Sequence, residues 1–99
     1  GGGGGLTFGA FEPVEVDDVD ASIAAAFAAS EMTRQSTSDE HTHLKEVVRA
    51  KKQALPGGSN IVVTLRVAVG SNPEKLVEAT VHRSLAGDFA LDDFHDVSS

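Results

Sequence analysis

The sequence predicts an α+β fold in which one long helix packs across a four- to five-stranded antiparallel sheet. Residues 17–33 place apolar side chains at helical spacing, whereas residues 44–51 and 60–69 alternate apolar and polar side chains as strands do. Short segments rich in Gly, Pro, Asn and Ser separate the later stretches and supply turn chemistry. One helix followed by strands that short turns connect is typical of an antiparallel sheet with the helix covering one face.

Length, charge and composition exclude several classes of function. The chain has 99 residues, 40% of them hydrophobic, which is enough for one core without covalent staples. Cysteine is absent, so disulfides, thiolate nucleophiles and Cys-based zinc sites are excluded. The formal net charge of −7 repels phosphate backbones, and we expect no nucleic-acid partner. Because no apolar run reaches the roughly 18–20 residues of a bilayer span, we expect a soluble protein without membrane contact.

The chain divides into an arm and one domain. Residues 1–13, GGGGGLTFGAFEP, have too much backbone freedom to order by themselves, and we expect a flexible glycine-rich arm there. Residues 14–99 then form a single domain. The sequence leaves the compartment open, because the chain starts at Gly1 without Met and a Cys-free chain suits oxidising and reducing spaces alike.

The helix is expected to begin at Asp17 or Asp18, since either carboxylate can cap it and favours the positive end of the helix dipole. Small Ala residues dominate the segment, which suits a helix that lies close against a sheet. The residues expected to face that sheet are Val19, Ile23, Ala26, Phe27 and Ser30.

The strands are expected to form a meander of hairpins. Residues 44–51 alternate Leu, Glu, Val and Ala with more basic neighbours, and residues 60–69 give the clearest strand. A third strand follows over residues 76–83, and the last apolar run covers residues 89–97. The order along the chain is therefore arm, helix and then hairpins.

Catalysis lacks a constellation in this sequence. His41 and His43 could bring two imidazoles to one side of a strand, but nothing nearby specifies a third ligand, so we expect no metal site and no cofactor. There is no G-x-S-x-G elbow, and no strand precedes the glycine run to make a phosphate cradle. We expect a protein that presents a surface rather than an enzyme.

Three features would make such a surface: the arm, a first hairpin tip with Leu55 and Pro56 exposed, and a second tip with Leu85 exposed. In an antiparallel meander these two turns lie at the same end of the sheet, which the arm can also reach. Apolar residues at loop tips cost solubility, so two of them at one edge indicate a partner. The alternative is that Leu55 and Leu85 fold back onto the core.

The same residues carry a family likeness. QALPG, Gln53–Gly57, resembles the Gln-x-Val-x-Gly first-hairpin motif of the cystatins and lies between two strand-like runs as that motif does. The GGLT arm at residues 4–7 and the VHRSLAGD segment resemble the cysteine-free stefin branch, whose second hairpin often reads Ser-Leu-Pro-Gly. The likeness covers nearly the whole chain, in the right order.

The resemblance implies a cystatin-like fold and a reversible, tight-binding inhibitor of papain-like cysteine proteases. In that family the arm and two hairpins form a wedge that enters the active-site cleft, and no catalytic residue or metal is needed. By likeness to stefins, a cytoplasmic monomer is implied, with secretion and a domain-swapped dimer left open. The residues that the resemblance assigns to protease binding are Gly4, Gly5, Gln53, Ala54, Leu55, Pro56, Gly57, Leu85, Ala86 and Gly87.

Departures from the family pattern favour an alternative. Leu55 replaces the usual Val, Pro56 removes a backbone donor, and Ala86 stands where stefins often carry Pro. The residues before Gly4 are all Gly and offer no side chains to the protease. These changes leave open a non-inhibitory interaction module of the same fold with another protein partner.

Overall fold

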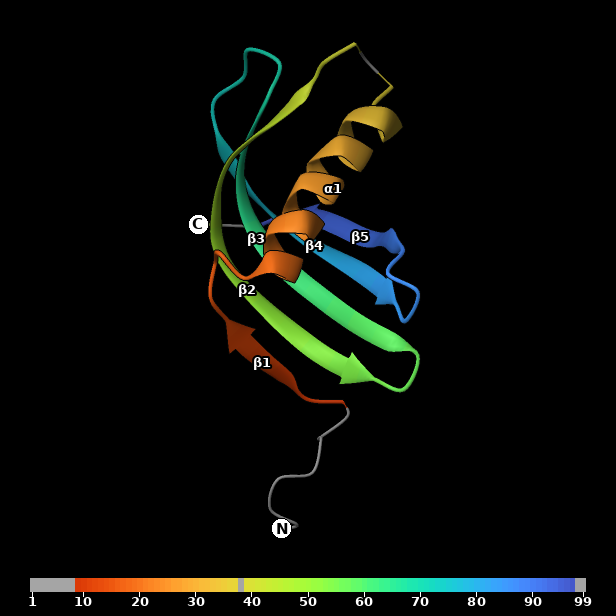
Figure 1. Ribbon diagram of the computed structural model, residues 1–99. Coiled ribbons are helices and arrows are strands. Elements are labelled where there is room, and N and C mark those ends of the chain that lie inside the picture. The colour runs from red at the N-terminus through yellow and green to blue at the C-terminus, as the bar shows by residue number, and fades with distance from the viewer. Residues whose placement is uncertain (1–8, 38, 98–99) are drawn as a thin grey trace.

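One helix lies across one face of a five-stranded antiparallel sheet, as the sequence predicts (Figure 1). The computed structural model describes residues 9–37 and 39–97. The strands lie side by side in the order β1-β2-β3-β4-β5. The elements are β1 (Phe11–Val14), α1 (Val19–Gln35), β2 (Thr42–Leu55), β3 (Gly58–Val69), β4 (Lys75–Ser84) and β5 (Phe89–Asp96).

Strand β1 was not foreseen as a separate element before the helix. It pairs antiparallel with β2, from Phe11 opposite Gln53 to Val14 opposite Ala50. The boundary that we expected after Pro13 therefore falls inside a strand, and residues 11–13 belong to the sheet. Pro13 is tolerated because β1 is an edge strand, where a missing N–H need not break a ladder.

Helix α1 begins where the sequence indicates, but it turns a different face to the sheet. Asp18 caps it, accepting a hydrogen bond from the Ala21 amide at 3.1 Å. The expected inward face is wrong: Val19 is 70% exposed and Ile23 is 46% exposed. The buried residues of α1 are instead Ala21, Ala24, Ala25, Ala28, Ala29 and Met32.

The small side chains decide this orientation. Spacings of three and four residues put all of the buried Ala residues on one stripe, so the helix axis can approach the sheet closely. A helix turned to bury Val19 and Ile23 would stand further away and leave the Ala stripe in water. Of the other residues expected on the inner face, Ala26 and Ser30 are exposed, and Phe27 is half-buried beside Phe89 with ring centroids 6.1 Å apart.

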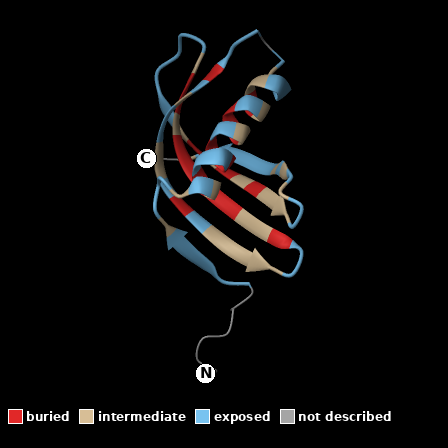
Figure 2. Ribbon diagram, viewed as in Figure 1, coloured by how far each residue is buried: buried red, intermediate tan, exposed pale blue. Residues whose placement is uncertain are grey.

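Strand β3 is the centre of the core. Ile61, Val63, Leu65 and Val67 are fully buried against α1, and Val62 and Thr64 on the other face are also buried (Figure 2). Register shifts in β2 between Leu44 and Glu46 and between Val47 and Arg49 interrupt the alternation that the sequence shows. Within the described ranges, no helix has the length and apolar content needed to cross a bilayer.

Candidate functional site

The first hairpin turns through two residues, Pro56 and Gly57, because Leu55 still pairs with Gly58. Proline fixes φ near −65°, which excludes the primed turns that need a positive φ at this position. Pro56 and Gly57 are exposed at the tip, as predicted for Pro56. Leu55 is half-buried rather than exposed, because the short turn keeps it in the ladder of β2.

Gly58 follows the first turn and also packs against the base of the second hairpin. It is buried, has a φ of 143°, and lies opposite Ser84 of β4. A Cβ at this position would run into the Arg83 carbonyl oxygen. Glycine therefore lets β4 approach β3 at the base of both hairpins, which the sequence did not reveal because Gly57 and Gly58 look equivalent there.

The second hairpin is held by Ser84. The Ser84 amide donates to the Asp88 carbonyl at 2.8 Å, the Gly87 amide donates to the Ser84 carbonyl at 2.9 Å, and the Asp88 amide donates to Ser84 Oγ at 3.1 Å. Gly87 has a φ of 93°, which the loop needs to close. Leu85 is 74% exposed and Ala86 is exposed, as predicted for this tip.

Both hairpin turns leave the sheet at the same end, and the start of β1 lies there too (Figure 1). Phe11 pairs with Gln53, and Gln53 Nε2 donates to the Gly9 carbonyl at 3.0 Å. We call the exposed tips, Pro56 with Gly57 and Leu85 with Ala86, together with Gly9, the loop edge. Gly4 and Gly5 lie outside the described residues.

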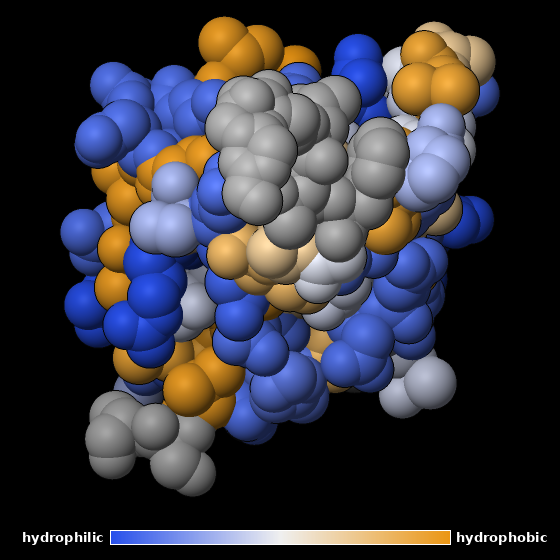
Figure 3. Space-filling model, turned by 90° about the horizontal axis from the view of Figure 1, so that it is seen from below, coloured by the Kyte–Doolittle hydropathy of each residue, from blue (hydrophilic) through white to orange (hydrophobic). Residues whose placement is uncertain are grey.

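The surface at this end mixes apolar and polar groups. Seen from below, hydrophobic and hydrophilic side chains lie next to one another over the part of the surface that the view shows (Figure 3). Pro56 and Leu85 are exposed apolar residues at the two tips, and such residues offer contact points to a partner.

A charge cluster behind the loop edge fixes the start of α1 to the sheet. Lys52 of β2 contacts Asp20 at 2.9 Å and Asp18 at 3.9 Å, and Arg83 of β4 contacts Asp20 at 3.8 Å. Lys52 and Asp20 each expose 28% of their side chains, so solvent screens the pair only in part. Asp20 therefore joins the bases of both hairpins to the helix.

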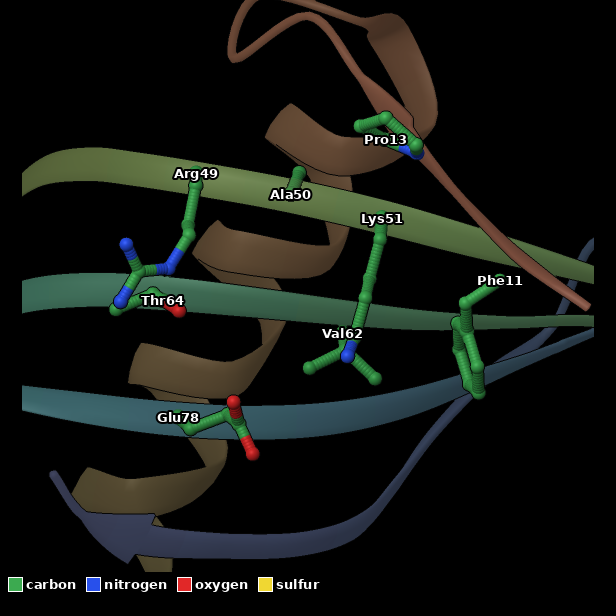
Figure 4. A pocket seen from close by; sticks show the side chains of 8 residues that line it. All are labelled: Phe11, Pro13, Arg49, Ala50, Lys51, Val62, Thr64 and Glu78. Atoms are coloured by element: carbon green, nitrogen blue, oxygen red, sulfur yellow. The ribbon is translucent and has the colours of Figure 1, made fainter.

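A shallow hollow of about 200 Å³ lies on the sheet face away from α1, lined in part by Phe11, Arg49, Lys51 and Glu78 (Figure 4). The Lys51 ammonium lies 5.1 Å from the centre of the Phe11 ring, within cation–π range, and helps to hold β1 on β2. The hollow follows the middle of the strands, so it is separate from the loop edge.

The two histidines considered as metal ligands do lie together, with His41 and His43 ring centroids 4.6 Å apart. Across residues 9–37 and 39–97, no group of three or more His, Cys, Asp or Glu side chains is placed to hold a metal ion.

Comparison with known proteins gives the fold a family. The family model described as Cystatin domain matches residues 9–94. The chain belongs to the cystatin family. Among solved structures, the crystal structure of Al-CPI resembles this cystatin with a TM-score of 0.65 and 17% sequence identity, over 90% of this chain and 100% of that one. A comparison with curated protein sequences gives no match.

Family membership confirms the predicted cystatin fold and suggests cysteine protease inhibition rather than catalysis. Likeness to the stefin branch remains a prediction. Because the sequence identity with Al-CPI is only 17%, this comparison supports the fold of the cystatin and nothing about its function.

Proposed function

We propose that this cystatin is a reversible, tight-binding inhibitor of papain-like cysteine proteases and that the N-terminal arm and the two hairpins block the active-site cleft. The observation that carries the proposal is the loop edge: two short hairpin tips and Gly9 meet at one end of a rigid sheet. The tips expose apolar groups at Pro56 and Leu85, which a concave cleft can cover.

The physical basis of inhibition is steric. Both tips are held by short turns and by the Gly58 to Ser84 pairing, so little conformational freedom is lost when a partner covers them. The hairpins present turns rather than an extended segment, so no inhibitor bond lies across the protease nucleophile. Inhibition then requires neither an acid, a base nor a metal from this chain.

Each residue of the site has a separate part in this proposal. Gly4 and Gly5 of the arm would pass beside the catalytic cysteine, where a side chain would collide. The tip residues Pro56, Gly57, Leu85 and Ala86 would contact the cleft directly. Leu55, Ala54, Gln53 and Gly87 are half-buried and would support the tips from behind.

One experiment tests the proposal directly. Papain is titrated with the protein, and residual activity is expected to fall in proportion to the inhibitor added and to recover on dilution. The inhibitor is expected to keep its intact mass throughout. Absence of inhibition at micromolar protein would contradict the proposal.

A second candidate is a non-inhibitory interaction module with another protein partner. Pro56 favours it, because an exposed tip without a backbone N–H offers one hydrogen-bond donor fewer to a protease. In that case the papain titration gives no inhibition, while substitutions at the loop edge leave the fold intact.

A further inference from the structure

A row of three polar side chains crosses the sheet next to the hairpins and ends on the backbone of Gly9. Gln53 of β2, Asn60 of β3 and His82 of β4 are direct register partners. Asn60 Nδ2 lies 2.8 Å from Gln53 Oε1, and His82 Nδ1 lies 3.0 Å from Asn60 Oδ1. All three side chains point away from α1, since Asn60 alternates with the core residue Ile61.

The row has one direction of hydrogen bonding. The Gly9 carbonyl can only accept, so Gln53 must turn its amide nitrogen toward it and its oxygen toward Asn60. Asn60 then donates to Gln53 and presents its own oxygen to His82, whose Nδ1 must carry a proton. Both the Nδ1–H neutral tautomer and the imidazolium meet this requirement, so the order does not depend on the charge of His82.

We propose that Gln53, Asn60 and His82 act as positioning residues that hold the root of the N-terminal arm in register with both hairpins. The row spans β2 and β3, which the first turn joins, and β4, which leads into the second turn. Its last donor, Gln53 Nε2, binds the carbonyl of Gly9, from which the arm departs. This inference rests on the proposed inhibitory function and changes the part of Gln53 in it. Gln53 acts through Gly9 rather than by touching the protease.

The half-buried state of Gln53 supports a role inside the molecule. Its amide nitrogen and its oxygen each have an intramolecular partner, at 3.0 and 2.8 Å. These two bonds fix the orientation of the amide, and one N–H and one lone pair of Gln53 stay available beyond them. A carbonyl of Gly9 held in this way before binding lowers the ordering cost when a partner arrives.

The test replaces the last donor of the row. Gln53→Glu keeps the size of the side chain but puts an acceptor oxygen against the Gly9 carbonyl. Amide hydrogen exchange at residues 9–14 is expected to become faster, and inhibition of papain is expected to weaken about tenfold, the effect of losing one or two hydrogen bonds. Gln35→Glu adds the same charge at the end of α1 and is expected to change neither.

A double-mutant cycle that combines Gln53→Glu with removal of residues 1–8 shows whether Gln53 positions the arm or contacts the protease itself. In a protein that lacks residues 1–8, Gln53→Glu is expected to change inhibition less than twofold, because the part of the arm that Gly9 would direct is gone. An equal loss in the full and the shortened chain would overturn the proposal, since Gln53 would then act at the hairpin itself. Unchanged exchange at residues 9–14 would overturn it as well.

A second variant keeps the test decisive if Gln53→Glu folds poorly. Asn60→Asp removes the donor that orients Gln53, and amide exchange at residues 9–14 is expected to become faster, as in Gln53→Glu. His82→Gln keeps an N–H donor for the Asn60 oxygen, and its effect on the same exchange is expected to be smaller. Exchange is measured without protease. If the unaltered protein failed to inhibit papain, the proposed inhibitory function would be wrong. The exchange data would still show whether the Gln53, Asn60 and His82 row holds residues 9–14 in place.

Discussion

Gly58 of β3 lies directly opposite Ser84 of β4, and these two residues form the bases of the two hairpins. The first turn, Pro56 and Gly57, ends immediately before Gly58, and the second loop begins immediately after Ser84. One pair of backbone partners therefore sets the relative height of both tips. The separation of the tips depends on how closely two strands approach, which in turn depends on the absence of a side chain at residue 58.

Gly58→Ala is expected to destabilise the protein by about 2–4 kcal/mol, because it combines an unfavourable φ of 143° with overpacking against the Arg83 carbonyl. Gly57→Ala is the matched control: a Cβ there meets nothing within 4 Å, and stability should stay within about 1 kcal/mol. Urea unfolding measures both. Equal effects of the two substitutions would contradict the role assigned to Gly58.

The types of α1 and of β2 to β5 were predictable from the sequence because each has a strong period or a turn signal. The buried face of α1 was not, since Val19 and Ile23 outweigh Ala in any hydrophobic pattern although Ala permits the closer approach. Strand β1 was missed because four residues that include Pro13 next to a glycine run carry no strand signal.

The loop edge was predictable only in outline. The turn chemistry around Pro56 and the sequence SLAGD located both tips, and the meander placed them at one end. The bonds of Gln53 to Gly9 and Asn60 join residues 44 and 7 positions apart, and the first of these depends on a strand that the sequence does not announce. The part of Gln53 inside the molecule therefore needed the register of the sheet.

Asp20→Asn is expected to lower the free energy of unfolding by about 1 kcal/mol, because it weakens the partly screened contacts of Asp20 with Lys52 and Arg83. The difference from the unaltered protein should shrink in 1 M NaCl, where such contacts are screened. Asp17→Asn removes the same charge from an exposed residue outside the cluster and is the control. A salt-independent loss would contradict the electrostatic role assigned to Asp20.

Leu55→Asp is expected to weaken inhibition of papain strongly and to cost about 1 kcal/mol of stability, the value of a half-buried rather than an exposed leucine. Both effects follow from its place at the end of β2, next to the turn. Inhibition assays and thermal unfolding measure them separately. If the variant were unfolded, Leu55 would be a core residue and could not support the tip of a wedge.

Leu85→Asp is expected to weaken inhibition at least tenfold while the midpoint of thermal unfolding stays nearly constant, because 74% of the side chain already lies in water. Val19→Asp is the matched control, since Val19 is 70% exposed but belongs to α1 and not to the loop edge. A charge placed there should leave inhibition unchanged. If both variants weakened inhibition equally, the effect would come from the added charge and its repulsion of the protease, and the second hairpin would lose its assigned part in binding. If Leu85→Asp left inhibition unchanged, only the arm and the first hairpin would contribute to protease binding.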